Sequence, residues 1–138
     1  MNYFLKLIII TLIILNSQIV NSEVYKISNT EIQNLIDEGV PIIDIRREEE
    51  WVSTGIIKHS HLLTFFDKNG NYNLENWMSE FEKIVEVNKP FILICRTGRR
   101  TNIIANYLSK ETNYNFVYDA DGGIISWMAS GNNTVSPK

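Results

Sequence analysis

The chain has 138 residues, of which 44% are hydrophobic and 21% charged, so it is long enough for one compact domain and too short for two. Its net charge of −3 at neutral pH makes nucleic acid and anionic membranes poor general partners.

The N-terminal segment differs in kind from the rest of the chain. A single lysine precedes an apolar run over residues 7–15, which one threonine interrupts, and polar residues follow. This outline is typical of a signal peptide that is cleaved after a small residue, here Ser22. The run is far shorter than the roughly 20 residues of a spanning helix, which makes a retained membrane anchor the weaker alternative. We expect residues 1–22 to be removed on export to a bacterial periplasm, leaving no membrane anchor, and N-terminal sequencing tests this.

After this segment, short apolar runs alternate with amphipathic stretches. In chain order, the first half predicts a strand at 24–27, a helix that starts at a capping box over 28–31 and ends at Gly39, a strand at 41–45, a short acidic helix at 47–52 and a strand at 62–66. The second half predicts a helix that Asn73 caps and whose apolar stripe runs from Leu74 to Val85, a strand at 91–94, a helix that contains residues 103–108, a strand at 116–118 and a last short helix that contains residues 124–128.

This alternation predicts an α/β fold with a mostly parallel central sheet and helices on both faces, because parallel strands need crossover connections that cover the sheet. We expect one domain over residues 23–131, followed by a flexible tail at 132–138. Ligands of such sheets bind beyond the carboxyl ends of the strands. Asp44, Arg46 and Cys95 each stand at or just past such an end, so we expect them along one rim.

Cys95 is the only cysteine, so it cannot form a disulfide within the chain. It stands where a buried strand leads into a helix, and the backbone N–H groups and dipole of a helix N-terminus stabilise a thiolate. Arg96, Arg99 and Arg100 add positive charge nearby. Gly98 allows the loop amides to converge on one centre. We interpret Cys95 as a reactive nucleophile for a small anionic substrate rather than as a buried structural cysteine.

The segment 95–101, Cys-Arg-Thr-Gly-Arg-Arg-Thr, resembles the active-site loop of the rhodanese family, especially its small exported single-domain sulfurtransferases. Residues 42–57, with Ile-Ile-Asp-Ile-Arg, Glu-Trp and Gly-Ile-Ile, resemble the first signature of that family. Residues 122–131, with Gly-Gly-Ile, a tryptophan and a closing glycine, resemble its last one. The resemblance covers residues 24–131.

This resemblance implies that Cys95 takes a sulfane sulfur from a donor such as thiosulfate, holds it as a persulfide and passes it to cyanide or a thiol, without a cofactor. It implies that the donor is held by the rest of the loop, which comprises Arg96, Thr97, Gly98, Arg99, Arg100 and Thr101. Any of the three arginines is a candidate to face the donor. Asp44 and Arg46 are expected to tie loops around the site rather than to touch substrate.

The loop after Gly55 departs from the family pattern. Lys58, His59, Ser60 and His61 stand where the family tends to have proline, glycine and alanine, so we expect this loop to take a different path. The two histidines have no further histidine or cysteine partner that would complete a metal site, and we expect none.

Two other functions are weighed against sulfur transfer. A cysteine phosphatase also has a strand, a cysteine and arginine loop and a helix, but it needs one residue more than the four that separate Cys95 from Arg100. A non-catalytic rhodanese-like binding or sensor module is the alternative from another class, with a dedicated persulfide carrier between the two. Such modules often lack the cysteine that this chain retains.

Overall fold

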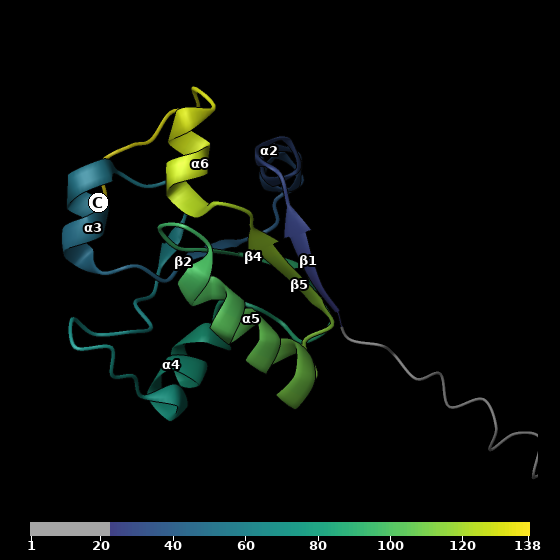
Figure 1. Ribbon diagram of the computed structural model, residues 1–138. Coiled ribbons are helices and arrows are strands. Elements are labelled where there is room, and N and C mark those ends of the chain that lie inside the picture. The colour runs from purple at the N-terminus through teal and green to yellow at the C-terminus, as the bar shows by residue number, and fades with distance from the viewer. Residues whose placement is uncertain (1–22) are drawn as a thin grey trace, which may run out of the picture.

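A computed structural model describes residues 23–138 (Figure 1). The expected signal peptide at 1–22 lies outside the described residues. Within 23–138 there are five strands, β1 (Glu23–Ile27), β2 (Ile42–Asp44), β3 (His61–Leu62), β4 (Phe91–Ile94) and β5 (Phe116–Ala120). The same part of the chain has five helices, α2 (Asn29–Asp37), α3 (Glu48–Thr54), α4 (Leu74–Phe81), α5 (Arg99–Glu111) and α6 (Gly123–Ala129). None of these helices has the length and apolar character needed to cross a membrane.

The five strands form one sheet in the order β1-β5-β4-β2-β3, and every neighbouring pair is parallel. The expected α/β fold with a parallel sheet is therefore confirmed. Strand β4 lies at the centre, between β5 and β2, and all four of its residues are buried. The strand that leads to Cys95 is thus paired on both sides and buried along its whole length.

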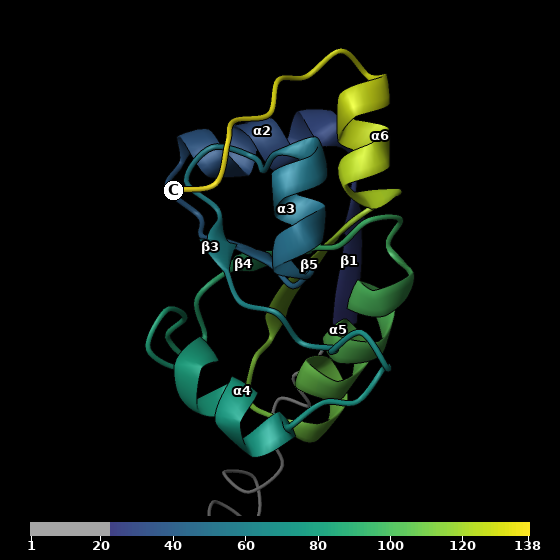
Figure 2. The same ribbon diagram turned by 90° about the vertical axis from the view of Figure 1, so that its left-hand side faces the viewer.

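Helices cover both faces of the sheet (Figure 2). Successive residues of a strand point to opposite faces, so β4 contributes to two separate cores. Phe91 and Leu93 pack with residues of α4 and α5 on one face. Ile92 and Ile94 pack with residues of α2 and α6 on the other face. Because both faces of β4 are apolar and buried, its position in the sheet is fixed.

Helix starts follow the local sequence closely. Ser28 and Glu31 form the predicted capping box, in which each side chain binds the backbone N–H of the other residue. Asn73 caps α4 by accepting a hydrogen bond from the backbone N–H of Asn76 at 3.0 Å. Gly39 follows the end of α2 with φ of 85°, a backbone conformation that glycine adopts at no steric cost.

Two predicted elements are shorter than expected. Helix α4 ends at Phe81, because the next residues tighten into turns in which the Ile84 N–H binds the Phe81 carbonyl at 2.9 Å. Val85 is nevertheless buried in the same core. Strand β3 ends at Leu62. Beyond it the Phe65 N–H still donates to the Ile45 carbonyl at 3.2 Å, and the Phe65 ring packs edge-on against Trp77, with ring centres 5.1 Å apart. The apolar pattern therefore predicted burial better than it predicted the ends of the elements.

The segment after α6 contacts the body of the domain. Val135 and Ile56 exchange two backbone hydrogen bonds of 2.9 Å in an antiparallel bridge. The Trp127 indole N–H donates to the Asn133 carbonyl at 2.9 Å, and the Thr134 hydroxyl donates to the Thr54 carbonyl at 2.9 Å. The first part of the segment expected as a flexible tail is thereby held against α3 and α6.

The N-terminus of α6 packs directly on the loop that follows β4. The Ile124 N–H donates to the Cys95 carbonyl at 2.9 Å, and the Ile125 N–H donates to the Arg96 carbonyl at 3.2 Å. This approach requires a glycine at 123, because a Cβ there would lie 2.5 Å from the Cys95 carbonyl oxygen and 2.6 Å from the Arg96 carbonyl carbon.

Replacing Gly123 by Ala should lower the free energy of unfolding by about 3 kcal/mol or more, because a backbone clash adds to the cost of a positive φ. Gly131→Ala is the matched control, since Gly131 has φ of 80° and its Cβ would meet nothing within 4 Å. We expect it to cost only about 1 to 2 kcal/mol. Urea unfolding of the three proteins measures both values, and equal losses in the two variants would contradict the close contact.

Candidate active site

The candidate site lies at the carboxyl ends of the central strands, where β4 passes through a short loop into α5 (Figure 1). Cys95 is the residue after β4, and α5 starts at Arg99. Gly98 is the N-cap of the helix and has φ of 87°, which glycine adopts at no steric cost, and its amide faces the cysteine. The sequence and the topology therefore place Cys95 at the ligand-binding edge of the sheet.

The Cys95 sulfur is surrounded by polar groups of its own loop. The Gly98 N–H donates to Sγ at 3.2 Å. The Thr101 hydroxyl oxygen lies 3.6 Å from Sγ and 3.1 Å from the Gly98 carbonyl oxygen, to which it donates. The Gly98 amide therefore points a hydrogen-bond donor at the sulfur. Cys95 is only 1% exposed, because the loop closes over the side chain.

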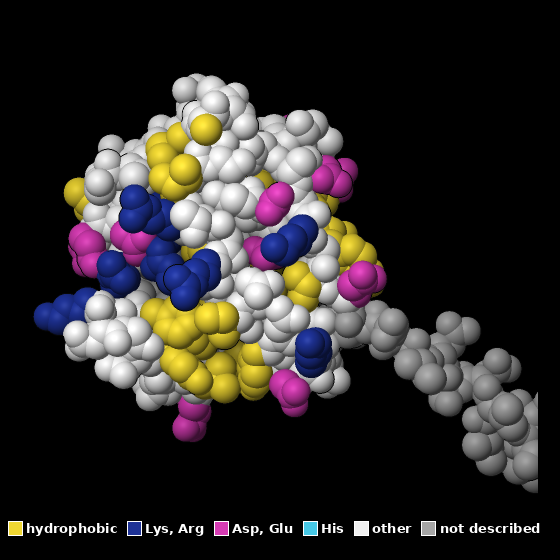
Figure 3. Space-filling model, in the orientation of Figure 1, with side chains coloured by type: hydrophobic (Ala, Val, Ile, Leu, Met, Phe, Trp, Pro, Cys, Tyr) yellow, Lys and Arg dark blue, Asp and Glu magenta, His cyan; other side chains and the backbone are white. Residues whose placement is uncertain are grey.

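The three loop arginines have different surroundings. Arg96 and Arg99 are exposed, as is Thr97, and within residues 23–138 neither of these two arginines forms an ion pair. Arg100 is partly buried and binds both carboxylate oxygens of Glu50, with N–O distances of 2.8 and 2.6 Å. Figure 3 shows Lys and Arg side chains gathered around the start of α5 and the nearby end of α3, above a hydrophobic surface. Two free cations therefore face solvent beside the loop, and the third fixes the loop to α3.

Glu50 is a site residue to which the sequence reasoning gave no role. Burial raises the pKa of Glu50, but hydrogen bonds from Arg100 and from the Arg47 N–H outweigh burial and lower it from 4.5 to about 2. The Glu50 carboxylate in turn raises the pKa of Arg100. The sequence offered one signal for this residue: Glu50 stands next to Trp51 in the segment that resembles the first family signature.

Asp44 and Arg46 form a buried ion pair in which neither residue is exposed. The guanidinium Nε and Nη2 bind the Asp44 carboxylate at 2.9 and 2.7 Å. The remaining Arg46 donors reach the Thr54 hydroxyl at 2.7 Å and the Gly55 carbonyl at 2.9 Å. A buried charge is tolerated only when it is paired in this way. These side-chain hydrogen bonds thus join the end of β2 to the end of α3 rather than to the Cys95 loop.

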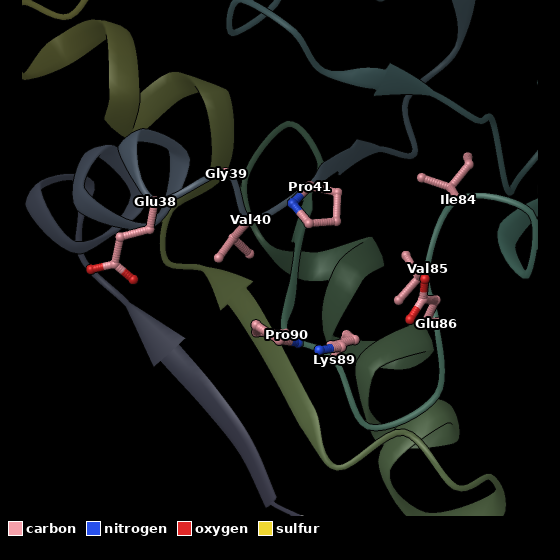
Figure 4. Close-up of a pocket in the computed structure, with 9 residues that line it drawn as sticks. All are labelled: Glu38, Gly39, Val40, Pro41, Ile84, Val85, Glu86, Lys89 and Pro90. Carbon is pink, nitrogen blue, oxygen red and sulfur yellow. The ribbon is translucent and has the colours of Figure 1, made fainter.

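The other candidates lie away from Cys95. His59 lies on the loop before β3 and His61 is the first residue of β3; both are exposed, and His59 has a positive φ of 68°. The pocket drawn in Figure 4, of about 340 Å³, is lined by residues that precede β2 and β4, such as Pro41 and Pro90. It therefore lies at the amino ends of the strands, opposite the Cys95 edge.

A family model described as the rhodanese-like domain matches residues 28–130. The chain therefore belongs to the rhodanese-like family. It is 25% identical over 109 residues to the thiosulfate sulfurtransferase GlpE of Pseudomonas fluorescens, covering 79% of this chain and 89% of that protein. It is 32% identical over 105 residues to GlpE of Pseudoalteromonas translucida, covering 75% of this chain and 89% of that protein. These relatives support a role within the sulfurtransferase family.

Solved structures agree on the fold. A rhodanese-related protein from Thermoplasma volcanium has a TM-score of 0.60 and 25% identity, covering 80% of this chain and 97% of that one. The polysulfide-sulfur transferase homodimer of Wolinella succinogenes has a TM-score of 0.65 at 18% identity, covering 86% of this chain and 83% of that one. The second likeness concerns the fold alone.

Replacing Glu50 by Gln should lower the free energy of unfolding by about 1 to 2 kcal/mol at pH 7, a value that allows for partial screening of the pair by solvent. A depressed carboxyl pKa stabilises the fold above the unfolded value, near 4.5, and this contribution disappears as the pH falls toward 2. The difference between the two proteins should therefore vanish over that interval. Urea unfolding at a series of pH values measures it.

Glu49→Gln is the control for this prediction, because Glu49 is an exposed neighbour on α3 that pairs with Arg47. We expect it to change stability little. A Glu50→Gln difference that persists unchanged at pH 2 would contradict the ion-pair account.

Proposed function

We propose that the protein is a sulfurtransferase that takes a sulfane sulfur from thiosulfate or a similar donor onto Cys95. The sulfur is held there as a persulfide and passed to cyanide or a thiol. The observation that carries this proposal is the Gly98 N–H, which donates to the Cys95 sulfur at 3.2 Å at the carboxyl edge of the sheet. Its support from outside the structure is the similarity to thiosulfate sulfurtransferases.

The proposed reaction has two displacement steps at sulfur. The Cys95 thiolate attacks the outer sulfur of thiosulfate, a new S–S bond forms, and the old S–S bond breaks as sulfite leaves with its electron pair. The acceptor then attacks the outer sulfur of the persulfide and restores the thiolate. No oxidant, reductant or cofactor is consumed. The amide that donates to Sγ stabilises the negative charge at the start and the end of this cycle.

The loop residues have separate roles in this proposal. Arg96 and Arg99 are exposed and unpaired among the described residues, so they attract the donor dianion from solvent. Arg100 supports the loop by forming an ion pair with Glu50 of α3. Thr97 lies exposed at the mouth of the loop. The thiol is only 1% exposed, so the donor has to approach it with its terminal sulfur.

Cys95→Ser should abolish sulfur transfer from thiosulfate to cyanide, because a hydroxyl cannot form a persulfide and the chain has no second cysteine. Thiocyanate production measures the activity, and circular dichroism checks that the variant is folded. A phosphate monoester run in parallel should not be hydrolysed. Turnover by the serine variant, or an inactive wild type, would instead favour the binding-module alternative.

Arg96→Ala and Arg99→Ala should each raise the KM for thiosulfate roughly three- to tenfold at low salt, and the effect should shrink as salt rises. Their free energies of unfolding should stay within about 0.5 kcal/mol of wild type, because both side chains are exposed. Arg100→Ala should lower stability as well, since it leaves Glu50 without its partner. Steady-state kinetics and urea unfolding separate the two patterns. Equal losses of stability in all three variants would contradict this division of roles.

A further inference from the structure

A pocket beside the edge strand β3 has no part in the proposed reaction. It has a volume of about 570 Å³ and lies between the loop before β3 and the last residues of the chain, whose end is seen beside β3 in Figure 2. Its lining includes both histidines of the chain and two lysines, namely His59, His61, Lys58 and Lys138. None of its lining residues belongs to the loop over 95–101, so this pocket is separate from the candidate active site.

The charged side chains of this pocket all carry one sign of charge. No aspartate or glutamate is among its described lining residues, and within residues 23–138 neither Lys58 nor Lys138 forms an ion pair. This arrangement stands out in a chain that has 16 acidic and 13 basic residues and a net charge of −3. A hollow lined by charges of one sign raises the local concentration of ions of the opposite sign. The pocket therefore favours an anion.

The loop that forms one wall of the pocket has two features that packing does not explain. His59 has φ of 68°, a conformation that residues other than glycine adopt rarely and that clusters at ligand-binding sites. The neighbouring Ser60 lines the same pocket, and among the described residues its buried hydroxyl has no hydrogen-bond partner. A buried hydroxyl without a partner calls for an explanation. An oxygen-rich anion in the pocket would supply the missing acceptor.

The remaining wall of the pocket is apolar. Ile56, Leu62 and Val135 line it, and Val135 is 41% exposed. The two backbone hydrogen bonds of 2.9 Å between Ile56 and Val135 hold this wall together. The volume lies within the range of about 300 to 1,000 Å³ that is usual for sites of small molecules. A ligand that fits both walls has an anionic group and a small apolar part.

We propose that this pocket is a second binding site, for a small organic anion that carries a phosphate or sulfate group. Lys58 and Lys138 attract the anionic group, and His59 and His61 add to this attraction when they are protonated. The apolar part of the ligand contacts the wall formed around Val135. The residues that depart from the family pattern, 58–61, are the ones that supply most of the basic lining.

The charge of this site depends on pH through its two histidines. Histidine is the side chain that gains a positive charge as the pH falls from about 8 to about 5. The other charged groups that face His59 and His61 are the two lysines of the pocket and Asp37 of α2, which lines the adjacent hollow together with Lys58 and His59. The affinity for an anion should therefore rise as the pH falls through this interval.

The test is a nuclear magnetic resonance titration of the ¹⁵N-labelled protein with butyl sulfate and methyl sulfate at constant ionic strength. Both probes keep the same single charge throughout this range of pH, so a change in affinity reports on the protein. We expect saturable shifts of the backbone amides of residues 58–62 and 135–138, with binding about fivefold tighter at pH 5.5 than at pH 8. Butyl sulfate should bind at least about threefold more tightly than methyl sulfate, because its extra methylene groups contact the apolar wall.

Variants of the basic wall complete the experiment. Lys58→Gln should weaken binding about three- to tenfold at both pH values, whereas Lys110→Gln, which changes an exposed lysine in the last turn of α5, should leave it unchanged. A protein with both His59→Asn and His61→Gln should bind equally at the two pH values, and asparagine tolerates the positive φ at 59.

Three results would each overturn the proposal: shifts confined to residues 95–101, equal wild-type affinity at the two pH values, or equal losses in Lys58→Gln and Lys110→Gln. The replaced side chains are exposed, so the variants should melt close to wild type. The titration needs no sulfur donor, so its outcome is independent of whether Cys95 transfers sulfur.

Discussion

The chain has to turn from a buried central strand into a helix between Ile94 and Arg99, and it does so around a sulfur atom. At the end of this turn Gly98 has a positive φ, with which the chain enters the helix. The turn carries the Gly98 amide to within 3.2 Å of the Cys95 sulfur. Both the shielding of the thiol from solvent and the donor that stabilises its charge follow from this one reversal of the backbone.

Contacts from two other elements hold that loop in place. The N-terminus of helix α6 donates hydrogen bonds to carbonyl groups of the loop, and Gly123 permits this approach because a side chain there would clash with the loop backbone. Helix α3 holds its far end through the pair between Glu50 and Arg100. The buried pair between Asp44 and Arg46 fixes α3 itself by binding its last turn. The site is therefore supported by side chains far apart in the sequence, as a preorganised charge-stabilising site requires.

Much of the fold could be predicted from the sequence because its signals are local. The capping box at Ser28, the cap at Asn73 and the apolar run that ends at Ile94 each act within a few residues, and the structure has all three. The ends of α4 and β3 were predicted less well, because tertiary packing around Phe81 and Phe65 decides where those elements stop. Periodicity predicts which side chains are buried without fixing where the hydrogen-bonding pattern changes.

The candidate site was predictable only in part for the same reason. Cys95 and its loop are contiguous, so their pattern can be recognised in the sequence. The partner of Arg100 lies 50 residues away, and the sequence alone did not distinguish this arginine from Arg96 and Arg99. Long-range pairing of polar groups is the information that the structure adds.

The proposed function requires Cys95 to carry a sulfur atom, and intact-protein mass spectrometry measures this directly. After incubation with thiosulfate the wild-type protein should gain the mass of one sulfur atom, and cyanide should remove it. A Cys95→Ser protein treated in the same way should keep its original mass. A wild-type protein that never gains the sulfur, or a serine variant that does, would contradict the account.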